Sequence, residues 1–202
     1  MIRDITVFPE VQSQFAHTPD SGCNQLEVSF TNQSSGSATS LLWEFGDGGS
    51  SIEDTPVHLF ENFGLNDTTY TTRLIAITDE SCTDTSEVDI TVYSYVNAEF
   101  TFTNSPVCTP FDVVLYNAST GGTSFHWDFG DGHDTTVNNT DSVIHRFTNS
   151  SLTDPVTYDI VLTVTNARNC TSVQRKEITV LPLVDAAFSV DVDQGCHPVS
   201  VD

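Results

Sequence analysis

A six-residue motif that occurs twice constrains the fold of this chain more than any other feature. Residues 43–48 read Trp-Glu-Phe-Gly-Asp-Gly, and residues 127–132 read Trp-Asp-Phe-Gly-Asp-Gly. Strand-like segments at residues 4–7, 89–92 and 177–180 recur at a similar interval of about 85 residues. Self-similarity at a fixed period is the signature of tandem structural units. The chain is therefore predicted to consist of repeats.

The repeat frame divides the chain into two complete units and two fragments. The complete units are predicted at residues 11–94 and 95–182. Residues 1–10 are predicted to be the last strand of a truncated preceding unit, and residues 183–202 the start of a further truncated unit. The alternative is that these flanks are only strand-like tails. Because the matched spacing recurs at three sites, we expect a segment of a longer array.

The residue pattern within each unit predicts β-strands. Residues 157–164 alternate with period two and are rich in β-branched residues, and residues 70–77 are their counterpart. Residues 26–30 and 112–116 alternate in the same way. No segment carries a convincing i, i+3, i+4 apolar stripe of an amphipathic helix. These patterns predict an all-β chain of tandem antiparallel sandwiches, with about seven strands in each unit.

The acidic composition argues against two classes of partner. With 28 acidic and 6 basic residues the formal net charge is −22. Because phosphate binding needs clustered Lys and Arg, we expect no nucleic acid partner, and an anionic membrane surface is disfavoured for the same reason. No apolar run approaches the ~20 residues of a membrane-spanning helix, so no membrane insertion is expected. Shared between the units, the charge suits a highly solvated array whose neighbouring units repel one another.

Each complete unit has an early cysteine near its start and a late cysteine near its end. These are Cys23 and Cys82 in the first unit and Cys108 and Cys170 in the second, and Cys196 is the early cysteine of the last fragment. The natural pairing is one bridge per unit, Cys23 with Cys82 and Cys108 with Cys170. Each bridge would close a loop of about 60 residues and contribute on the order of 4 kcal/mol in the loop-entropy model. A metal site is the alternative, but no CxxC spacing occurs. Disulfides imply an oxidising compartment and hence export, and Cys196 is expected to find its partner outside this chain segment.

The repeated motif resembles the signature of the PKD domain family. It is preceded by Phe-Thr-Asn-Gln-Ser at residues 30–34 and by the variant Leu-Tyr-Asn-Ala-Ser at 115–119. His-x-Phe follows it at residues 58–60 and 145–147. The resemblance covers both complete units and, more faintly, both flanks. It implies immunoglobulin-like (Ig-like) β-sandwiches that are generally non-catalytic.

The paired early and late cysteines make the chain similar to PKD arrays of large secreted and cell-surface proteins of Bacteroidetes-type bacteria, gliding-motility adhesins among them. The resemblance implies an extracellular location and a role as a structural spacer or stalk. The implied partners are neighbouring PKD units of the same parent chain, with surface polysaccharide or other surface proteins as further candidates. The alternative function is a carbohydrate- or protein-binding accessory module of a secreted hydrolase. Neither GxSxG nor HExxH occurs, so the chain is predicted not to be an enzyme.

The motif residues are predicted to have structural roles. They are Trp43, Phe45, Gly46, Asp47 and Gly48 in the first unit and Trp127, Phe129, Gly130, Asp131 and Gly132 in the second. Each Trp shares a strand face with the Phe two positions later, which favours a core position over an exposed sugar-stacking platform. Each Gly-Asp-Gly predicts a tight turn that needs positive φ.

Asp47 and Asp131 have two interpretations. Each could accept hydrogen bonds from backbone N–H groups of its turn. Each could instead be a calcium ligand, because some PKD domains of secreted enzymes bind Ca²⁺, and calcium takes six to eight oxygen ligands. The sequence identifies no further ligands, so Ca²⁺ is the one cofactor kept as a hypothesis. His58 and His145 occupy equivalent positions after the turns and are predicted to be hydrogen-bonded structural residues.

Overall fold

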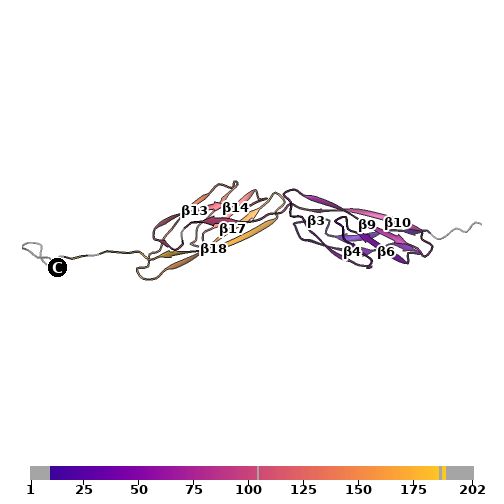
Figure 1. Ribbon diagram of the computed structural model, residues 1–202, viewed down its shortest axis with the longest axis horizontal. Coiled ribbons are helices and arrows are strands. Elements are labelled where there is room, and N and C mark those ends of the chain that lie inside the picture. The colour runs from indigo at the N-terminus through magenta and orange to yellow at the C-terminus, as the bar shows by residue number, and fades with distance from the viewer. Residues whose placement is uncertain (1–9, 104, 187, 190–202) are drawn as a thin grey trace, which may run out of the picture.

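A computed structural model describes residues 10–103, 105–186 and 188–189 (Figure 1). This part of the chain contains strands and no helix, and it forms two β-sandwiches that lie end to end. The predicted all-β, Ig-like fold class is confirmed. Within these residues there is accordingly no helix that could cross a membrane. The strand predicted within residues 1–10 and most of the fragment predicted at 183–202 lie outside the described residues.

Domain 1, the first sandwich, consists of a three-stranded sheet in the order β2-β4-β8 and a five-stranded sheet in the order β3-β10-β9-β6-β7, with a short β1–β5 pair beside them. Neighbouring strands are antiparallel except β3, which runs parallel to β10. The strands are β1 Val11–Gln12, β2 Phe15–Thr18, β3 Ser21–Gly22, β4 Leu26–Asn32, β5 Ser35–Gly36, β6 Ser40–Glu44, β7 Ser50–Ser51, β8 Val57–Phe60, β9 Thr68–Ile77 and β10 Thr83–Val92.

Domain 2 repeats this plan. Its sheets have the orders β11-β13-β16 and β12-β18-β17-β14-β15, and β12 runs parallel to β18. The strands are β11 Phe100–Phe102, β12 Val107–Cys108, β13 Phe111–Asn117, β14 Ser124–Asp128, β15 Asp134–Val137, β16 Val143–Phe147, β17 Val156–Thr165 and β18 Thr171–Leu181. In the part of the chain that the structure describes, each domain thus has eight strands in its two main sheets. The short parallel edge strands β3 and β12, of two residues each, carry no alternating pattern that a sequence could reveal.

Alternating side chains supply the core of each sandwich. Leu26, Val28 and Phe30 of β4 are buried, while the residues between them are exposed. Trp43 and Trp127 are 0% exposed and lie at the centre of the two cores. Neither indole therefore offers a face on which a sugar ring could stack.

Candidate functional site at the joint between the domains

The disulfide pairing expected from the repeat frame is wrong. Cys23 is bonded to Cys170, with their Cα atoms 5.6 Å apart, so the bridge joins domain 1 to domain 2. Cys82 and Cys108 carry free thiols. The expected bridges within the domains, Cys23 to Cys82 and Cys108 to Cys170, are not formed. Cys196 lies outside the described residues.

Strand length explains this correction. Cys82 directly precedes β10, whereas Cys23 follows β3, which pairs with the opposite end of β10. Ten residues of strand span about 34 Å, and a disulfide needs Cα atoms within about 7 Å. In domain 2, Cys108 and Cys170 are separated in the same way by β18. The early and late cysteines of one domain thus lie at opposite poles, and only end-to-end packing brings an early cysteine to a late one.

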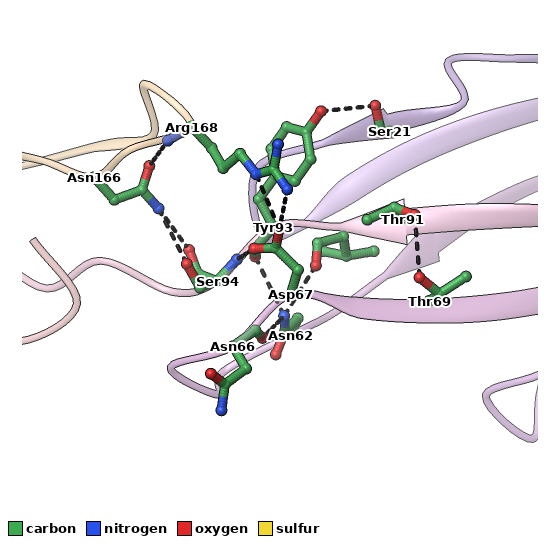
Figure 2. A network of polar contacts seen from close by, with 11 residues as sticks. Ser21, Asn62, Asn66, Asp67, Thr69, Thr91, Tyr93, Ser94, Asn166 and Arg168 are labelled. Atoms are coloured by element: carbon green, nitrogen blue, oxygen red, sulfur yellow. Dashed lines mark hydrogen bonds and ion pairs between the residues drawn. The ribbon is translucent and has the colours of Figure 1, made fainter.

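Ser94, in the linker between the domains, is held from both sides (Figure 2). Its N–H donates to Oδ1 of Asp67 in domain 1 at 2.9 Å. The Nδ2 of Asn166 in domain 2 donates to the carbonyl oxygen and the Oγ of Ser94, both at 3.2 Å. Arg168 of domain 2 closes the network, because its Nε and Nη2 atoms each lie 3.0 Å from Oδ2 of Asp67. We call these four residues the joint clasp.

Tyr93 ties the joint clasp to the sheet of domain 1. The Arg168 guanidinium lies 5.1 Å from the centroid of the Tyr93 ring, a cation–π arrangement. The Tyr93 hydroxyl lies 2.9 Å from Oγ of Ser21, and Figure 2 marks this contact with a dashed line. The N–H of Ser94, and after it the side chain of Arg168, lower the pKa of Asp67 below its ordinary value. Asp67 is therefore ionised, and paired with Arg168, throughout the neutral pH range.

The next linker residue, Tyr95, also contacts both domains. Its N–H donates to the carbonyl oxygen of Gly64 at 2.9 Å, and its ring meets Phe63 edge-on at 5.7 Å, both in domain 1. On the other side, Gly121 of domain 2 has φ +75°, and a Cβ there would overlap the carbonyl oxygen of Tyr95. The linker is thus fitted closely between the two sandwiches.

In domain 1 the Gly-Asp-Gly turn places Asp47 against His58. The Nε2 atom of His58 lies 2.7 Å from Oδ2 of Asp47, and the Gly49 N–H donates to Oδ1 at 2.8 Å. The His58 ring stacks on Phe45 with a centroid distance of 3.9 Å. Partial burial raises the pKa of Asp47, but these hydrogen bonds outweigh burial, and the net pKa is lowered.

Domain 2 repeats this pair and adds a histidine. The Nε2 atom of His145 lies 2.7 Å from Oδ2 of Asp131, and the His145 ring stacks on Phe129. His133 places its Nδ1 atom 3.2 Å from Oδ1 of Asp131 and donates its backbone N–H to the same oxygen at 3.1 Å. Partial burial raises the pKa of Asp131, but the hydrogen bonds, that of His145 first, lower it overall.

The ligand atoms near Asp47 and Asp131 determine which metal ions these two sites could bind. Ca²⁺ takes oxygen ligands, whereas the side chains nearest to both carboxylates are imidazoles. Calcium at Asp47 and Asp131 stays a prediction that no observation tests. The ligand atoms of Asp131, His133 and His145 all lie within 4.8 Å of one another, and such a set of two nitrogens and one carboxylate can hold a transition metal.

The two sandwiches and their stapled joint define the chain as a tandem of Ig-like modules. Residues 7–92 and 99–180 each match the PKD domain family. Because the two matches cover most of the chain, it belongs to the PKD domain family, as two consecutive copies.

Solved structures of three other proteins show similarity. The PKD1 domain of the Vibrio cholerae metalloprotease PrtV is 27% identical, covering 41% of this chain and 96% of that one, with a TM-score of 0.35. The PKD1 domain of Vibrio anguillarum Epp is also 27% identical, covering 43% and 98%, with a TM-score of 0.35. The fibronectin(III)-like modules of Clostridium thermocellum CbhA are 8% identical, covering 87% and 100%, with a TM-score of 0.37.

Sequence reasoning missed the joint clasp, because its residues belong to no motif. One signal was present in the composition. Arg168 is one of only six basic residues in a chain with 28 acidic ones, and it stands two positions before Cys170. Because basic residues are rare in this chain, Arg168 close to Cys170 could have indicated that this loop forms an interface.

Proposed function

We propose that this chain is a non-catalytic segment of an extracellular PKD-repeat array that acts as a structural spacer, or stalk, in a cell-surface adhesin. The observation that carries the proposal is the disulfide between Cys23 and Cys170, which fastens one domain to the next. A bridge inside a domain would stabilise that domain alone. A bridge across the joint fixes how the two domains are oriented, which is the property that a stalk needs.

The joint clasp adds to this restraint at other points of the interface. Arg168 contacts Asp67, while Asn166 contacts Ser94. With the disulfide, these contacts hold a short linker at several places, so bending would have to break more than one of them. Short, restrained linkers behave as stiff spacers rather than as flexible chains.

The composition supports the same role. The net charge of −22 makes neighbouring domains repel, which favours an extended arrangement at low salt. PKD and other Ig-like domains are typically non-catalytic modules. A disulfide persists in an oxidising compartment, which supports an extracellular location.

The biological setting belongs to the proposal as well. We place the array on the surface of Bacteroidetes-type bacteria, in an adhesin of the gliding-motility kind, with neighbouring PKD units of its parent chain as partners. The alternative is a carbohydrate- or protein-binding accessory module of a secreted hydrolase. That role calls for exposed aromatic side chains on one face. Both tryptophans are buried, and the exposed aromatics of the described residues, Phe63, Tyr116 and Phe188, lie in domain 1, in domain 2 and after domain 2. A glycan array separates the two functions, because strong binding to one polysaccharide would favour the accessory module.

Small-angle X-ray scattering tests the spacer role directly. We expect the full chain to scatter as an extended particle with a narrow distribution of conformations. The double variant Cys23→Ser/Cys170→Ser should show a broader distribution and a smaller mean radius of gyration. The matched control Cys82→Ser/Cys108→Ser removes thiols without touching the joint and should scatter like the unchanged chain. An unchanged chain that is already flexible, or a joint variant that scatters identically, would argue against the proposal.

A further inference from the structure

The two free thiols stand where the bonded cysteines of the joint have their counterparts. Cys82 precedes the last long strand of domain 1 as Cys170 precedes that of domain 2. Cys108 lies beside the end of the last strand of domain 2, as Cys23 does in domain 1. The free thiols therefore lie at the ends of the two sandwiches that face away from the joint, and each is equivalent to one half of the Cys23–Cys170 bridge. Cys108 is exposed and Cys82 is partly so.

A hollow at the outer pole of domain 1 matches the domain 2 side of the joint. Val11 and residues 82–84 line this hollow, with a volume of about 640 Å³. Their counterparts in domain 2, Val96 and residues 170–172, line a hollow of about 200 Å³ at the joint, where residues 23–25 of domain 1 close it. Among the described residues, the outer hollow has no counterpart of residues 23–25, the cysteine-bearing loop that closes the hollow at the joint.

We propose that Cys82 and Cys108 are halves of two further joints of the same kind, each formed with another PKD domain packed end to end. Cys82 forms a disulfide with the early cysteine of a preceding domain, and Cys108 forms one with the late cysteine of a following domain. This inference rests on the proposed function as an array segment and names its partner: a PKD domain with the same cysteine frame. The array would then carry one disulfide at every joint and none within a domain.

The joints need not share the joint clasp. By strand alignment, Asp67 and Ser94 correspond to Pro155 and Pro182 in domain 2, which offer neither a carboxylate nor a backbone N–H. The polar contacts are therefore particular to this joint, whereas the cysteines recur. The disulfide is the element that we expect to be common to all joints.

Formation of each bridge is an oxidation, and a disulfide such as oxidised glutathione can serve as the oxidant. Two cysteine thiols lose two protons and two electrons as their S–S bond forms. Oxidised glutathione accepts the two electrons and the two protons. Its own S–S bond breaks, and two molecules of reduced glutathione are released. The exchange proceeds through a mixed disulfide attacked by the second thiol.

A three-domain chain tests the inference. In this chain, residues 1–183 are followed by a second copy of residues 96–181. The junction keeps the repeat frame, because Val96 of the appended copy takes the place of Val184, which has the same position in the repeat. After folding in a glutathione buffer, non-reducing peptide mapping should find Cys108 linked to the late cysteine of the appended copy, with Cys23–Cys170 retained. The control carries Cys170→Ser in the appended copy only and should leave Cys108 reduced. A second chain, with residues 11–92 appended instead, supplies Cys82 as the late cysteine and keeps the test valid if the first chain fails to fold.

The outcomes separate the inference from the function on which it rests. If Cys108 stays reduced beside a folded third domain, or if that domain bridges its own two cysteines, the inference is wrong. The proposed function survives this result if scattering still shows an extended, stiff pair of domains. If Cys23 and Cys170 themselves are not linked, both the inference and the proposed function fail.

A second inference comes from the histidines of domain 2. The geometry points to a transition-metal site, of the kind that binds Zn²⁺, formed by Asp131, His133 and His145. Their ligand atoms already lie within 4.8 Å of one another, and His133 is 75% exposed, so its ring can turn to complete the site. Three protein ligands and one water make a tetrahedral zinc site with an open position. Domain 1 has Gly49 in place of His133 and therefore only two such ligands.

Zinc titration calorimetry on the full chain, with the free thiols alkylated, tests this site. We expect one Zn²⁺ per chain, and about tenfold or greater weakening in His133→Gly, which installs the residue of domain 1. The control Asp47→Asn should bind as the unchanged chain does. Zinc binding that His133→Gly leaves unchanged, or no zinc binding at all, would refute the site.

Discussion

The glycines of the turns show how a single residue can be required for two different reasons. Gly130 has φ +75°, and a Cβ there would lie 2.5 Å from the carbonyl oxygen of Asp159 in β17. Gly132 has φ +90°, but a Cβ there would meet nothing within 4 Å. The first position demands glycine for both backbone conformation and space, and the second for backbone conformation alone.

This difference predicts the ranking of two substitutions. Gly130→Ala should lower the free energy of unfolding of domain 2 by about 2–4 kcal/mol, because strain at positive φ adds to a backbone clash. Gly132→Ala should cost only about 1 kcal/mol. Urea unfolding of both variants measures the difference. Equal losses, or a larger loss for Gly132→Ala, would contradict this account of the turn.

Asp67 predicts how the joint responds to acid. Its folded pKa is lowered, so the stabilisation from the joint clasp is fully present above the ordinary carboxyl pKa of about 3.9 and is lost as pH falls through the lower folded value. An NMR titration of the carboxyl carbon of Asp67 should have its midpoint below that ordinary value. Arg168→Gln should move the midpoint upward. A midpoint at or above the ordinary value in the unchanged chain would show that the clasp is not formed in solution.

At the scale of the elements, alternation predicted the long strands well. The strands expected at residues 70–77 and 157–164 lie within β9 and β17. The predicted cysteine pairing was wrong because it rested on the order of the cysteines along the chain, whereas a disulfide depends on the distance between two cysteines in the folded protein. The length of β10 already holds the needed information, since Cys82 directly precedes it. What the sequence lacks is the position of the two-residue strand β3, which takes Cys23 to the far end of β10.

The observed pairing predicts how each sandwich responds to loss of the disulfide. Because each sandwich has a hydrophobic core of its own, Cys23→Ser/Cys170→Ser should leave each sandwich folded. While the other sandwich stays folded, the bridge and the linker close a loop of about 70 residues in the sandwich that unfolds, so each sandwich should lose on the order of 4 kcal/mol of unfolding free energy. Denaturant titration, followed through Trp43 for domain 1 and Trp127 for domain 2, measures both. In the single variant Cys23→Ser both domains should show this loss, whereas a loss from domain 1 alone would indicate a bridge inside it.

At the scale of the whole molecule, the repeat frame has consequences that neither domain has alone. Each sandwich carries an early cysteine at one pole and a late cysteine at the other, so stacking the domains end to end brings unlike cysteines together. The sequence predicted the repeats, the Ig-like fold and the family resemblance, because these depend on local pattern. It did not predict the joint, because Asp67 and Arg168 are 101 positions apart and meet only once both domains are folded and stacked.

Disulfide mapping of the unchanged chain shows directly whether Cys23 and Cys170 join the two domains. The chain is alkylated without reduction, digested with a protease that cuts at acidic residues, and analysed by mass spectrometry before and after reduction. We expect one linked pair of peptides containing Cys23 and Cys170, with Cys82 and Cys108 both alkylated. Linkage of Cys23 to Cys82, or of Cys108 to Cys170, would place the bridges inside the domains and contradict the stapled joint.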